Sequence, residues 1–250
     1  MFRISDLEFR IWYFRTASVS LIIIIIILSG CARLPVWKKD VPFTPENILA
    51  SLEMSQGSFQ RYSARGTLQL HTDTASVTLD CRWEILLPDT IRIQLYGPLG
   101  LRLGDLWVRG EKVDIMNYWM DIRETLSLHS VVKRFPGMVE VSSVKELYPF
   151  PLVSRRLLPT IDLEESKPEL GVLFFEDSTG QRQLQLDRKH TIITRESFQK
   201  SPQDSLLIKE YKSYRRVGKG WLPSRIRYSN GHSQQWMEVF FPTVKVRQNR

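Results

Sequence analysis

The sequence predicts a mainly antiparallel β (α+β) fold: an unclosed, strongly curved half-barrel of about eleven strands, with an N-terminal helix and an inserted helical lid or plug. Apolar and polar residues alternate along one segment after another, which is typical of antiparallel strands with one buried face. Short connections rich in turn residues separate these segments. An antiparallel sheet of that many strands tends to curl on itself. The alternation breaks once, in the middle of the chain, where we expect the inserted helices.

The first 30 residues predict a bacterial lipoprotein signal peptide. Arg3, Arg10 and Arg15 precede an apolar core of about 14 residues, which suits a signal peptide and falls short of the ~20 that span a bilayer. That core contains six consecutive isoleucines and ends in Leu28-Ser29-Gly30-Cys31, which resembles a lipobox. The alternative is a plain N-terminal membrane anchor.

Cys31 is the predicted lipidation site, because its thiol supplies the sulfur that takes a diacylglyceryl group. Three acyl chains exceed the two signals that stable anchoring needs, so we expect an exported chain tethered to a membrane. The predicted organisation is a signal peptide over 1–30, a tether linker over 31–43 and one domain over 44–250. The linker carries Pro35 and Pro42 and little periodicity, as linkers do.

The net charge of the chain is +8, and three arginines and two acidic residues precede Cys31, which leaves 32 basic and 25 acidic residues, or +7, after cleavage. A positive balance suits nucleic acid or an anionic membrane surface. Export excludes nucleic acid, and the basic residues are scattered over outward strand positions, which favours a solvated face. The remaining cysteine is Cys81, so no disulfide framework is expected.

A helix is predicted to begin after the linker, with Thr44 as N-cap, Pro45 at its first position and Glu46 in its first turn. Its apolar residues fall near one face, which should pack on the strands that follow. These residues are Ile48, Leu49, Leu52 and Phe59.

Five strands are expected next. Residues 64–71, 77–85 and 91–96 alternate cleanly. Along 101–108 the apolar phase changes at Gly104-Asp105, which predicts a β-bulge. A turn at Gly110-Glu111 leads to the fifth strand, which holds Val113 and Ile115.

Two capping-box patterns mark the middle of the chain. Asp121 with Glu124 predicts a helix over Asp121–Arg134, and Ser143 with Glu146 predicts a second helix that ends at Tyr148-Pro149-Phe150-Pro151.

Six further strands are expected after this insertion, and the connections between them carry turn residues. The strands are 172–175, 184–186, 191–194, 206–211, 222–228 and 236–241. The turns include Ser178-Thr179-Gly180, Gly218-Lys219-Gly220 and the hairpin signal Asn230-Gly231. The inward faces are rich in large apolar residues, and periodicity leaves two arrangements open: a packed core covered by the helices, or a partly empty cavity with the helices as a movable lid.

A family resemblance rests on Tyr62-Ser63-Ala64-Arg65-Gly66, the strand Ile91–Tyr96, and Gly97-Pro98-Leu99-Gly100 before an apolar strand. This combination resembles the LolB family of outer-membrane lipoproteins, which receive lipoproteins from a periplasmic carrier and insert them. The resemblance covers residues 45–118 and, more loosely, the hairpins Lys209–Val246, while Asp121–Leu170 departs from the family. It implies an unclosed antiparallel barrel whose helices plug an apolar cavity.

The resemblance also implies site residues. Leu99 matches the leucine of the family's protruding Pro-Leu-Gly loop, so Pro98, Leu99 and Gly100 form the expected membrane-insertion loop. The alternative is an ordinary turn whose leucine folds back onto the core. The expected acyl-binding cavity is lined by Leu68, Leu70, Leu79, Trp83, Ile91, Ile93, Leu95, Leu101 and Leu103.

Catalytic patterns are lacking in the sequence. Four widely separated histidines show no ligand spacing, and neither a Gly-x-Ser-x-Gly elbow nor a metal signature occurs. Glu164-Glu165 is interpreted as a solvated pair and Asp177 as part of a turn, and the strand tryptophans as core and rim packing. We therefore expect no enzyme activity, no cofactor and no metal.

The expected function is that of a monomeric, lipid-anchored envelope protein, in the outer membrane and facing the periplasm. It would bind acyl chains of lipoproteins and help to insert these in the outer membrane, with a periplasmic carrier protein as a partner. Ala32 lacks the aspartate that retains some bacterial lipoproteins at the inner membrane. The alternative is a structural or signalling lipoprotein that uses the same fold to bind a protein partner or to sense lipid.

Overall fold

A computed structural model describes residues 44–56, 60–128, 130–131, 144–151, 160–162, 170–177, 180–199, 201, 206–217, 220–231 and 234–247. The residue contacts divide the chain into two compact units, Met1–Arg33 and Leu34–Arg250, and the second unit contains every element described below. The predicted signal peptide, Cys31 and the linker lie outside the described residues. Among the residues that are described, no helix has the length and apolar character needed to cross a bilayer.

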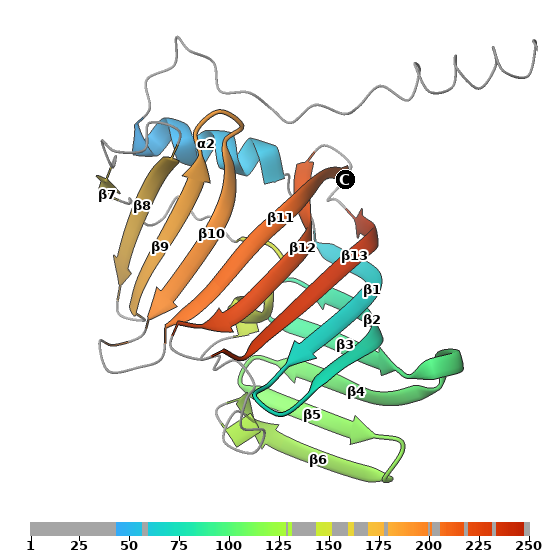
Figure 1. Cartoon of the computed structure of the whole chain (residues 1–250). Coiled ribbons are helices and arrows are strands. Elements are labelled where there is room, and N and C mark those ends of the chain that lie inside the picture. Colours follow the sequence, from blue (N-terminus) through green and yellow to red (C-terminus); the bar gives the residue numbers. More distant parts are fainter. Residues whose placement is uncertain are drawn as a thin grey trace, which may run out of the picture. The chain divides into compact units, whose positions relative to one another are not determined.

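One antiparallel sheet of thirteen strands dominates the second unit, and its order is β6-β5-β4-β3-β2-β1-β13-β12-β11-β10-β9-β8-β7 (Figure 1). The first six strands are β1 Arg61–His71, β2 Ser76–Leu86, β3 Thr90–Tyr96, β4 Arg102–Arg109, β5 Lys112–Asn117 and β6 Ile122–Ser127. The other seven are β7 Thr160–Asp162, β8 Leu170–Asp177, β9 Gly180–Asp187, β10 Ile192–Gln199, β11 Leu207–Val217, β12 Gly220–Asn230 and β13 Trp236–Arg247.

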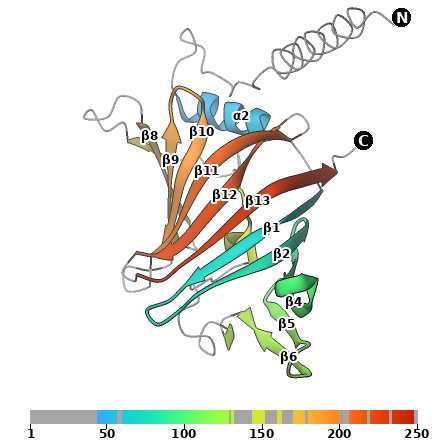
Figure 2. The same cartoon turned by 45° about the vertical axis from the view of Figure 1, so that its right-hand side comes forward.

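The order describes two meanders that meet in the middle of the sheet. The first strand of the domain, β1, pairs with the last, β13, so that Leu68 lies opposite Val239. The edges are therefore β6 and β7, and the sheet curves without closing (Figure 2). This confirms the predicted half-barrel. Among the described residues the sheet has two strands more than the eleven predicted, namely β6 and β7.

Strand β6 corrects the prediction of a helix over Asp121–Arg134 for residues 122–127, whereas Leu128 and residues 130–131, within the same range, are helical. Residues Ile122–Ser127 pair along the whole of β5, with Glu124 opposite Ile115 and Leu126 opposite Val113. Residues 122–127 form backbone hydrogen bonds with the edge of β5, and Leu126 gains an apolar surface to pack on. A local capping pattern cannot reveal such non-local pairing. Residues 129 and 132–143 lie outside the described residues.

The second capping pattern falls on a short 3₁₀ helix, η2 Val144–Leu147, which ends just before Tyr148-Pro149-Phe150-Pro151. The proline positions explain why it goes no further, since proline lacks a backbone N–H and disfavours a helical residue before it.

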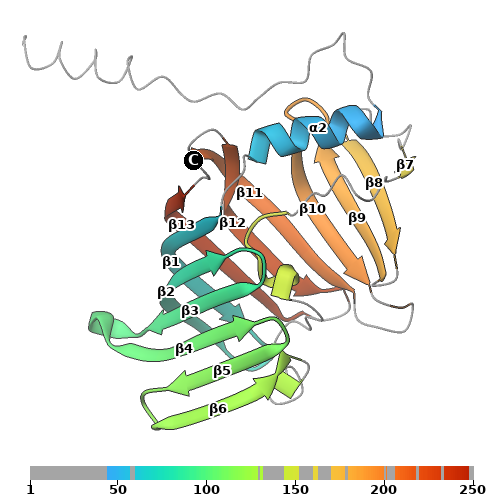
Figure 3. The same cartoon turned by 180° about the vertical axis from the view of Figure 1, so that it is seen from behind.

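The N-terminal helix is confirmed as α2 Pro45–Gln56, which contacts β12 and lies across one end of the neighbouring strands (Figure 3). The backbone N–H of Asn47 donates to Thr44 Oγ1 over 3.4 Å, as expected of an N-cap. Ile48, Leu49 and Leu52 are at most 2% exposed, so the predicted face is the buried one. Phe59 lies outside the described residues.

The predicted bulge in β4 is confirmed within one residue. Leu95 pairs with Gly104 and Tyr96 with Arg102, which leaves Leu103 as the extra residue. The Asn230-Gly231 signal also falls where expected, between β12 and β13, and Gly231 N–H donates to Leu206 O over 2.7 Å. The other two predicted turns join β8 to β9 and β11 to β12, although Ser178-Thr179 and Gly218-Lys219 lie outside the described residues.

Candidate functional site

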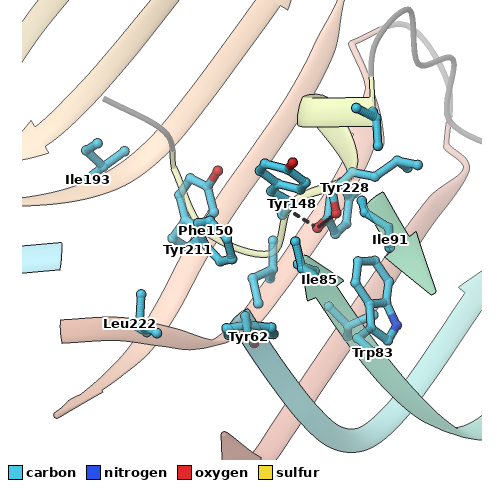
Figure 4. Close-up of a cluster of buried hydrophobic side chains, with 14 of the residues drawn as sticks. Tyr62, Trp83, Ile85, Ile91, Tyr148, Phe150, Ile193, Tyr211, Leu222 and Tyr228 are labelled. Carbon is cyan, nitrogen blue, oxygen red and sulfur yellow. Dashed lines mark hydrogen bonds between the residues drawn. The ribbon is translucent and has the colours of Figure 1, made fainter. Parts of the chain in front are cut away.

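The inward face of the sheet is covered by a segment that comes between the two edge strands in the chain. We call Val144–Pro151 the plug segment. Tyr148 and Phe150 are 0% and 2% exposed, and the ring centroid of Phe150 lies 5.3 Å from that of Tyr62 in β1 and 5.4 Å from that of Tyr148. Figure 4 shows these rings among side chains of β1, β2, β11 and β12. The plug segment therefore fills part of the interior with aromatic side chains.

Hydrogen bonds fix the plug segment on both sides. The Tyr148 hydroxyl donates to Pro88 O over 2.5 Å, and the Tyr228 hydroxyl lies 3.2 Å from both Leu147 O and Tyr148 O (Figure 4). Burial, with a smaller contribution from the charge of Asp89, raises the pKa of Tyr148 to about 12. Burial also raises the pKa of Tyr228 well above its ordinary value, so both hydroxyls stay protonated and remain donors at neutral pH.

The residues expected to line an acyl cavity divide into three groups. Trp83, Ile91, Leu68 and Ile93 are buried, between 0% and 8% exposed, and belong to the core. Leu70 and Leu95 are half-buried and pack against that core, whereas Leu79 and Leu103 are half-buried outside it. Leu101 is 58% exposed and lies beside the loop at the end of β3, away from the core.

The expected membrane-insertion loop is a single 3₁₀ turn, η1 Pro98–Gly100. Leu99 has φ 61° and Gly100 φ 74°, and the Gly97 N–H donates to Leu101 O over 2.8 Å. This turn directs the Leu99 side chain into solvent, where it is 99% exposed. The alternative in which Leu99 folds back onto the core does not hold. A left-handed backbone at a leucine is uncommon and strained, and this residue is held so that its apolar side chain protrudes.

A buried ionic cluster lies on the inward face of the other half of the sheet. Glu196 in β10 forms ion pairs with two cations: its Oε1 lies 2.7 Å from Arg182 Nε and its Oε2 lies 3.4 Å from Lys209 Nζ. The Tyr211 hydroxyl donates to Glu196 Oε2 over 2.5 Å. Burial alone would raise the pKa of Glu196, but the positive charges of Arg182 and Lys209 lower it to about 2. The carboxylate is therefore ionised at neutral pH.

The ionic cluster also faces the plug segment. Burial lowers the pKa of Lys209, and the negative charges of Glu196 and Glu146 oppose that effect. Glu146 belongs to η2 and is 9% exposed, and Lys209 lies opposite Tyr228 in the sheet. The plug segment thus meets both an aromatic surface and a charged one.

Sequence reasoning missed the ionic cluster and the role of Tyr148 and Phe150. A signal for the cluster was present, because Lys209 stands between Leu207 and Tyr211 in the inward phase of its strand. Buried charges need partners, but the partner Glu196 is adjacent only through strand pairing. The two aromatic residues were interpreted as part of a helix end, although aromatic residues interleaved with prolines also suit a buried extended segment.

In the described part of the chain we find no group of side chains arranged for chemistry other than binding. No group of three or more His, Cys, Asp or Glu side chains there is placed to hold a metal ion. His190 pairs with Asp187 across a turn, with 2.9 Å between Nδ1 and Oδ2. Cys81 is buried and free, and burial raises the pKa of its thiol to about 12, so it is unreactive as a nucleophile.

Comparison of the sequence with protein-family models and with curated proteins found no match. Solved structures do match in fold. A domain named as an outer-membrane lipoprotein-sorting protein from Vibrio parahaemolyticus has a TM-score of 0.59 at 13% identity, covering 83% of this chain and 93% of its own. A LolA superfamily protein from Nitrosomonas europaea has a TM-score of 0.57 at 12% identity, covering 84% and 96%.

A DUF1329 family protein from Desulfovibrio piger is similar to the same degree, with a TM-score of 0.59 at 8% identity, covering 81% of this chain and 91% of its own. The domain therefore shares its fold with these three proteins. At these identities the likeness concerns the fold, and the function has to be argued from the surfaces of this chain.

Proposed function

We propose that this chain is a LolB-like lipoprotein of the bacterial envelope, anchored in the outer membrane through Cys31 and facing the periplasm. It binds acyl chains of other lipoproteins against the inward face of its half-barrel and helps to insert them in the membrane. It works as a monomer, without enzyme chemistry or cofactor, and receives its cargo from a periplasmic carrier protein. Nucleic acid is not a partner.

One observation carries the proposal: Leu99 is 99% exposed on an ordered turn at the end of β3. Sinking such a side chain into hydrocarbon gains roughly 1.5–3 kcal/mol relative to water. A fold that only packed a core would gain from turning this leucine inward. The lipoprotein-sorting protein that shares the fold gives the proposal its biological setting.

An acyl chain can enter the interior only if the plug segment moves aside. Tyr148 and Phe150 now occupy space against Tyr62 that an acyl chain would enter. An entering acyl chain would replace the apolar contacts of the plug segment with its own. Each transfer step is therefore favourable when it buries more apolar surface of the acyl chain than the step before. The plug segment is therefore the lid of the predicted cavity.

Binding of an environment-sensitive fatty-acid probe tests this function. We expect saturable binding at micromolar concentration, displaced by lipoprotein acyl chains. A tryptophan-to-phenylalanine change at Trp83, which keeps the core apolar, should alter the affinity, and the same change at Trp236 outside the buried core should not. Absence of saturable binding to the folded protein would contradict the proposal.

The filled interior specifically favours a second function, in which the fold is a scaffold for a structural or signalling lipoprotein that binds a protein partner or senses lipid. The same probe experiment separates the two, because a scaffold binds no acyl chain in its interior.

Replacement of Cys31 tests the anchor itself. Cys31→Ser should leave an uncleaved precursor that incorporates no radiolabelled palmitate, and normal labelling would contradict the lipobox.

A further inference from the structure

Two neighbouring connections at one end of the sheet expose most of the large apolar side chains on the described surface. Of nine such exposed side chains, five belong to the connection from β3 to β4 or to that from β5 to β6. We call residues 98–101 and 118–121 the first and second tips. Their exposed side chains are Leu99 (99%), Leu101 (58%), Tyr118 (41%), Trp119 (80%) and Met120 (60%). Figures 1 and 3 both show the tips at the same end of the β3–β6 wing.

Side-chain and backbone contacts join the second tip to residues 102–103, which directly follow the first tip. Tyr118 N–H donates to Leu103 O over 2.9 Å, and the Arg102 guanidinium carbon lies 4.8 Å from the centre of the Tyr118 ring. Asp105 fixes Arg102 in this position, since Arg102 Nε donates to its Oδ1 over 2.8 Å. Arg92 donates to the other carboxylate oxygen of Asp105 over 2.9 Å.

The second tip is ordered by its own backbone, so the exposure of Trp119 does not come from a loose loop. Asn117 Oδ1 accepts hydrogen bonds from Trp119 N–H over 3.0 Å and from Met120 N–H over 3.2 Å. This is an Asx-turn, which stabilises a tight reversal of the chain. Asp121 completes the reversal with φ 50°. The turn therefore presents a tryptophan and a methionine to solvent at a fixed place, beside Leu99 and Leu101.

Guanidinium groups flank the apolar tips. Arg102 begins β4 and Arg123 lies in β6 opposite Met116, and both are exposed. Asp105 is buried and neutralised by two arginines, and Asp114 is bonded by Arg109. A pocket of about 520 Å³ on the outer face adjoins both arginines and Tyr118.

These features match the chemistry of a membrane surface layer by layer. Leucine and methionine suit hydrocarbon, tryptophan and tyrosine prefer the interfacial zone, and arginine binds phosphate. Apolar side chains on ordered turns, rimmed by basic residues, are also unfavourable in water unless something covers them. Asp105 and Asp114, the carboxylates next to Arg102 and Arg109, are already in ion pairs, whereas Asp121 adds an exposed carboxylate to the second tip.

We infer that the two tips form a single docking surface for a phospholipid bilayer, with Leu99 and Trp119 entering the membrane together and Arg102 and Arg123 at the level of the headgroup phosphates. Docking requires neither cargo nor an open interior, so it goes beyond the proposed function. It adds a second insertion element, Trp119-Met120, which no motif in the sequence indicated, and it fixes which end of the half-barrel faces the membrane.

Labelling of the full-length chain reconstituted into phosphatidylglycerol-containing liposomes tests the inference. A cysteine introduced as Trp119→Cys would carry an NBD label, while Cys81 is buried and shielded from the reagent and Cys31 is blocked by its acyl group in the lipidated protein. The matched control is Phe174→Cys in β8, a partly exposed position near the other edge of the sheet. With acyl-brominated lipids we expect at least threefold stronger quenching at 119 than at 174. Equal quenching would overturn the inference, as would shielding of the label at 119 by raised protein concentration without lipid, which would identify a second copy as the occupant.

Charge variants sharpen the test. Leu99→Glu and Arg123→Gln should each lower the quenching at 119 about twofold or more, because both tips dock as one surface. Arg216→Gln removes the same charge from an exposed position in β11 and should leave the quenching unchanged. Equal effects of the two arginine variants would overturn the inference. Fatty-acid probe binding should persist in all of them, so loss of probe binding with docking intact would count against the proposed function alone.

Discussion

The inward face of β9–β11 and the free end of the β3–β6 wing place side chains in opposite ways. The first buries charges, with Glu196 and Lys209 at 5% and 2% exposure. The second exposes apolar groups, with Leu99 and Trp119 at 99% and 80%. Most proteins do the reverse in both places. Substitutions in the first region should therefore change stability, whereas substitutions in the second should change membrane contact.

The largest effect is expected from Glu196→Gln, which breaks the charge pairing of the interior. The variant leaves the Lys209 ammonium buried without its carboxylate, and removing one partner of a buried pair costs about 3–5 kcal/mol. Chemical denaturation at neutral pH measures the loss. The double variant Glu196→Gln with Lys209→Met removes both charges and should recover much of it. No recovery would mean that the pairing does not account for the effect.

The same cluster predicts acid sensitivity. The pKa of Glu196 is about 2, below its ordinary value of 4.5, so its contribution to the free energy of unfolding is complete above about 4.5 and is lost as the pH falls from there toward 2. Denaturation curves over this range should show a steeper loss of stability in the wild type than in the double variant. Parallel curves would contradict the pKa assignment.

Gly66→Ala tests the junction between β1 and β13, the seam that joins the two regions. A Cβ added at Gly66 in β1 would lie 1.8 Å from the carbonyl oxygen of Phe240 in β13, a backbone atom that cannot move aside alone. Gly66→Ala should therefore cost about 3 kcal/mol, at the upper end for overpacking. Gly231→Ala is the matched control, because its Cβ would meet only the flexible Leu206 side chain at 3.1 Å. Equal melting temperatures of the two variants would show that the seam tolerates the extra atom.

A smaller effect is expected from Tyr228→Phe, which loosens the plug segment. The hydroxyl that reaches Leu147 O and Tyr148 O is lost, and leaving buried acceptors unsatisfied costs about 1–3 kcal/mol. Hydrogen exchange over residues 144–151 should accelerate, and fatty-acid probe affinity should rise if this segment is the lid.

Tyr214→Phe provides the control for that prediction. It also deletes a buried hydroxyl, which donates to Ile193 O over 2.5 Å, without touching the plug segment. Its stability should fall to a similar extent while exchange over 144–151 stays as in the wild type. Acceleration in both variants would show that the plug segment responds to general destabilisation.

Much of the sheet was predictable because its signal is local. Alternation in residues 77–85 and 91–96 required only a buried face, and the changed phase around Gly104 predicted the bulge. Strand β6 was not predictable in this way, because Asp121 and Glu124 imitate a helix cap while the pairing with β5 that decides the outcome is non-local. Short β7 carries too few residues to show a period.

The candidate site was predictable to different degrees in the two regions. The Gly97-Pro98-Leu99-Gly100 turn is determined by its own residues. The protruding Leu99 could therefore be predicted from the sequence with the help of the resemblance. The second tip could not be predicted in this way, because Trp119 indicates membrane contact only together with the first tip, which comes next to it in the fold. The pairing of Glu196 with Lys209 likewise depends on the register of β10 against β11, which no local pattern encodes.

The paired measurement of melting temperature and of lipoprotein transfer to liposomes for Leu99→Glu tests the central claim most directly. Because Leu99 is fully exposed, the variant should stay within about ±0.5 kcal/mol of the wild type. A carboxylate at this place makes contact with hydrocarbon unfavourable, so cargo should still bind while its insertion is lost. A variant with an unchanged melting temperature and undiminished transfer would contradict the insertion role of this loop and, with it, the function proposed for the protein.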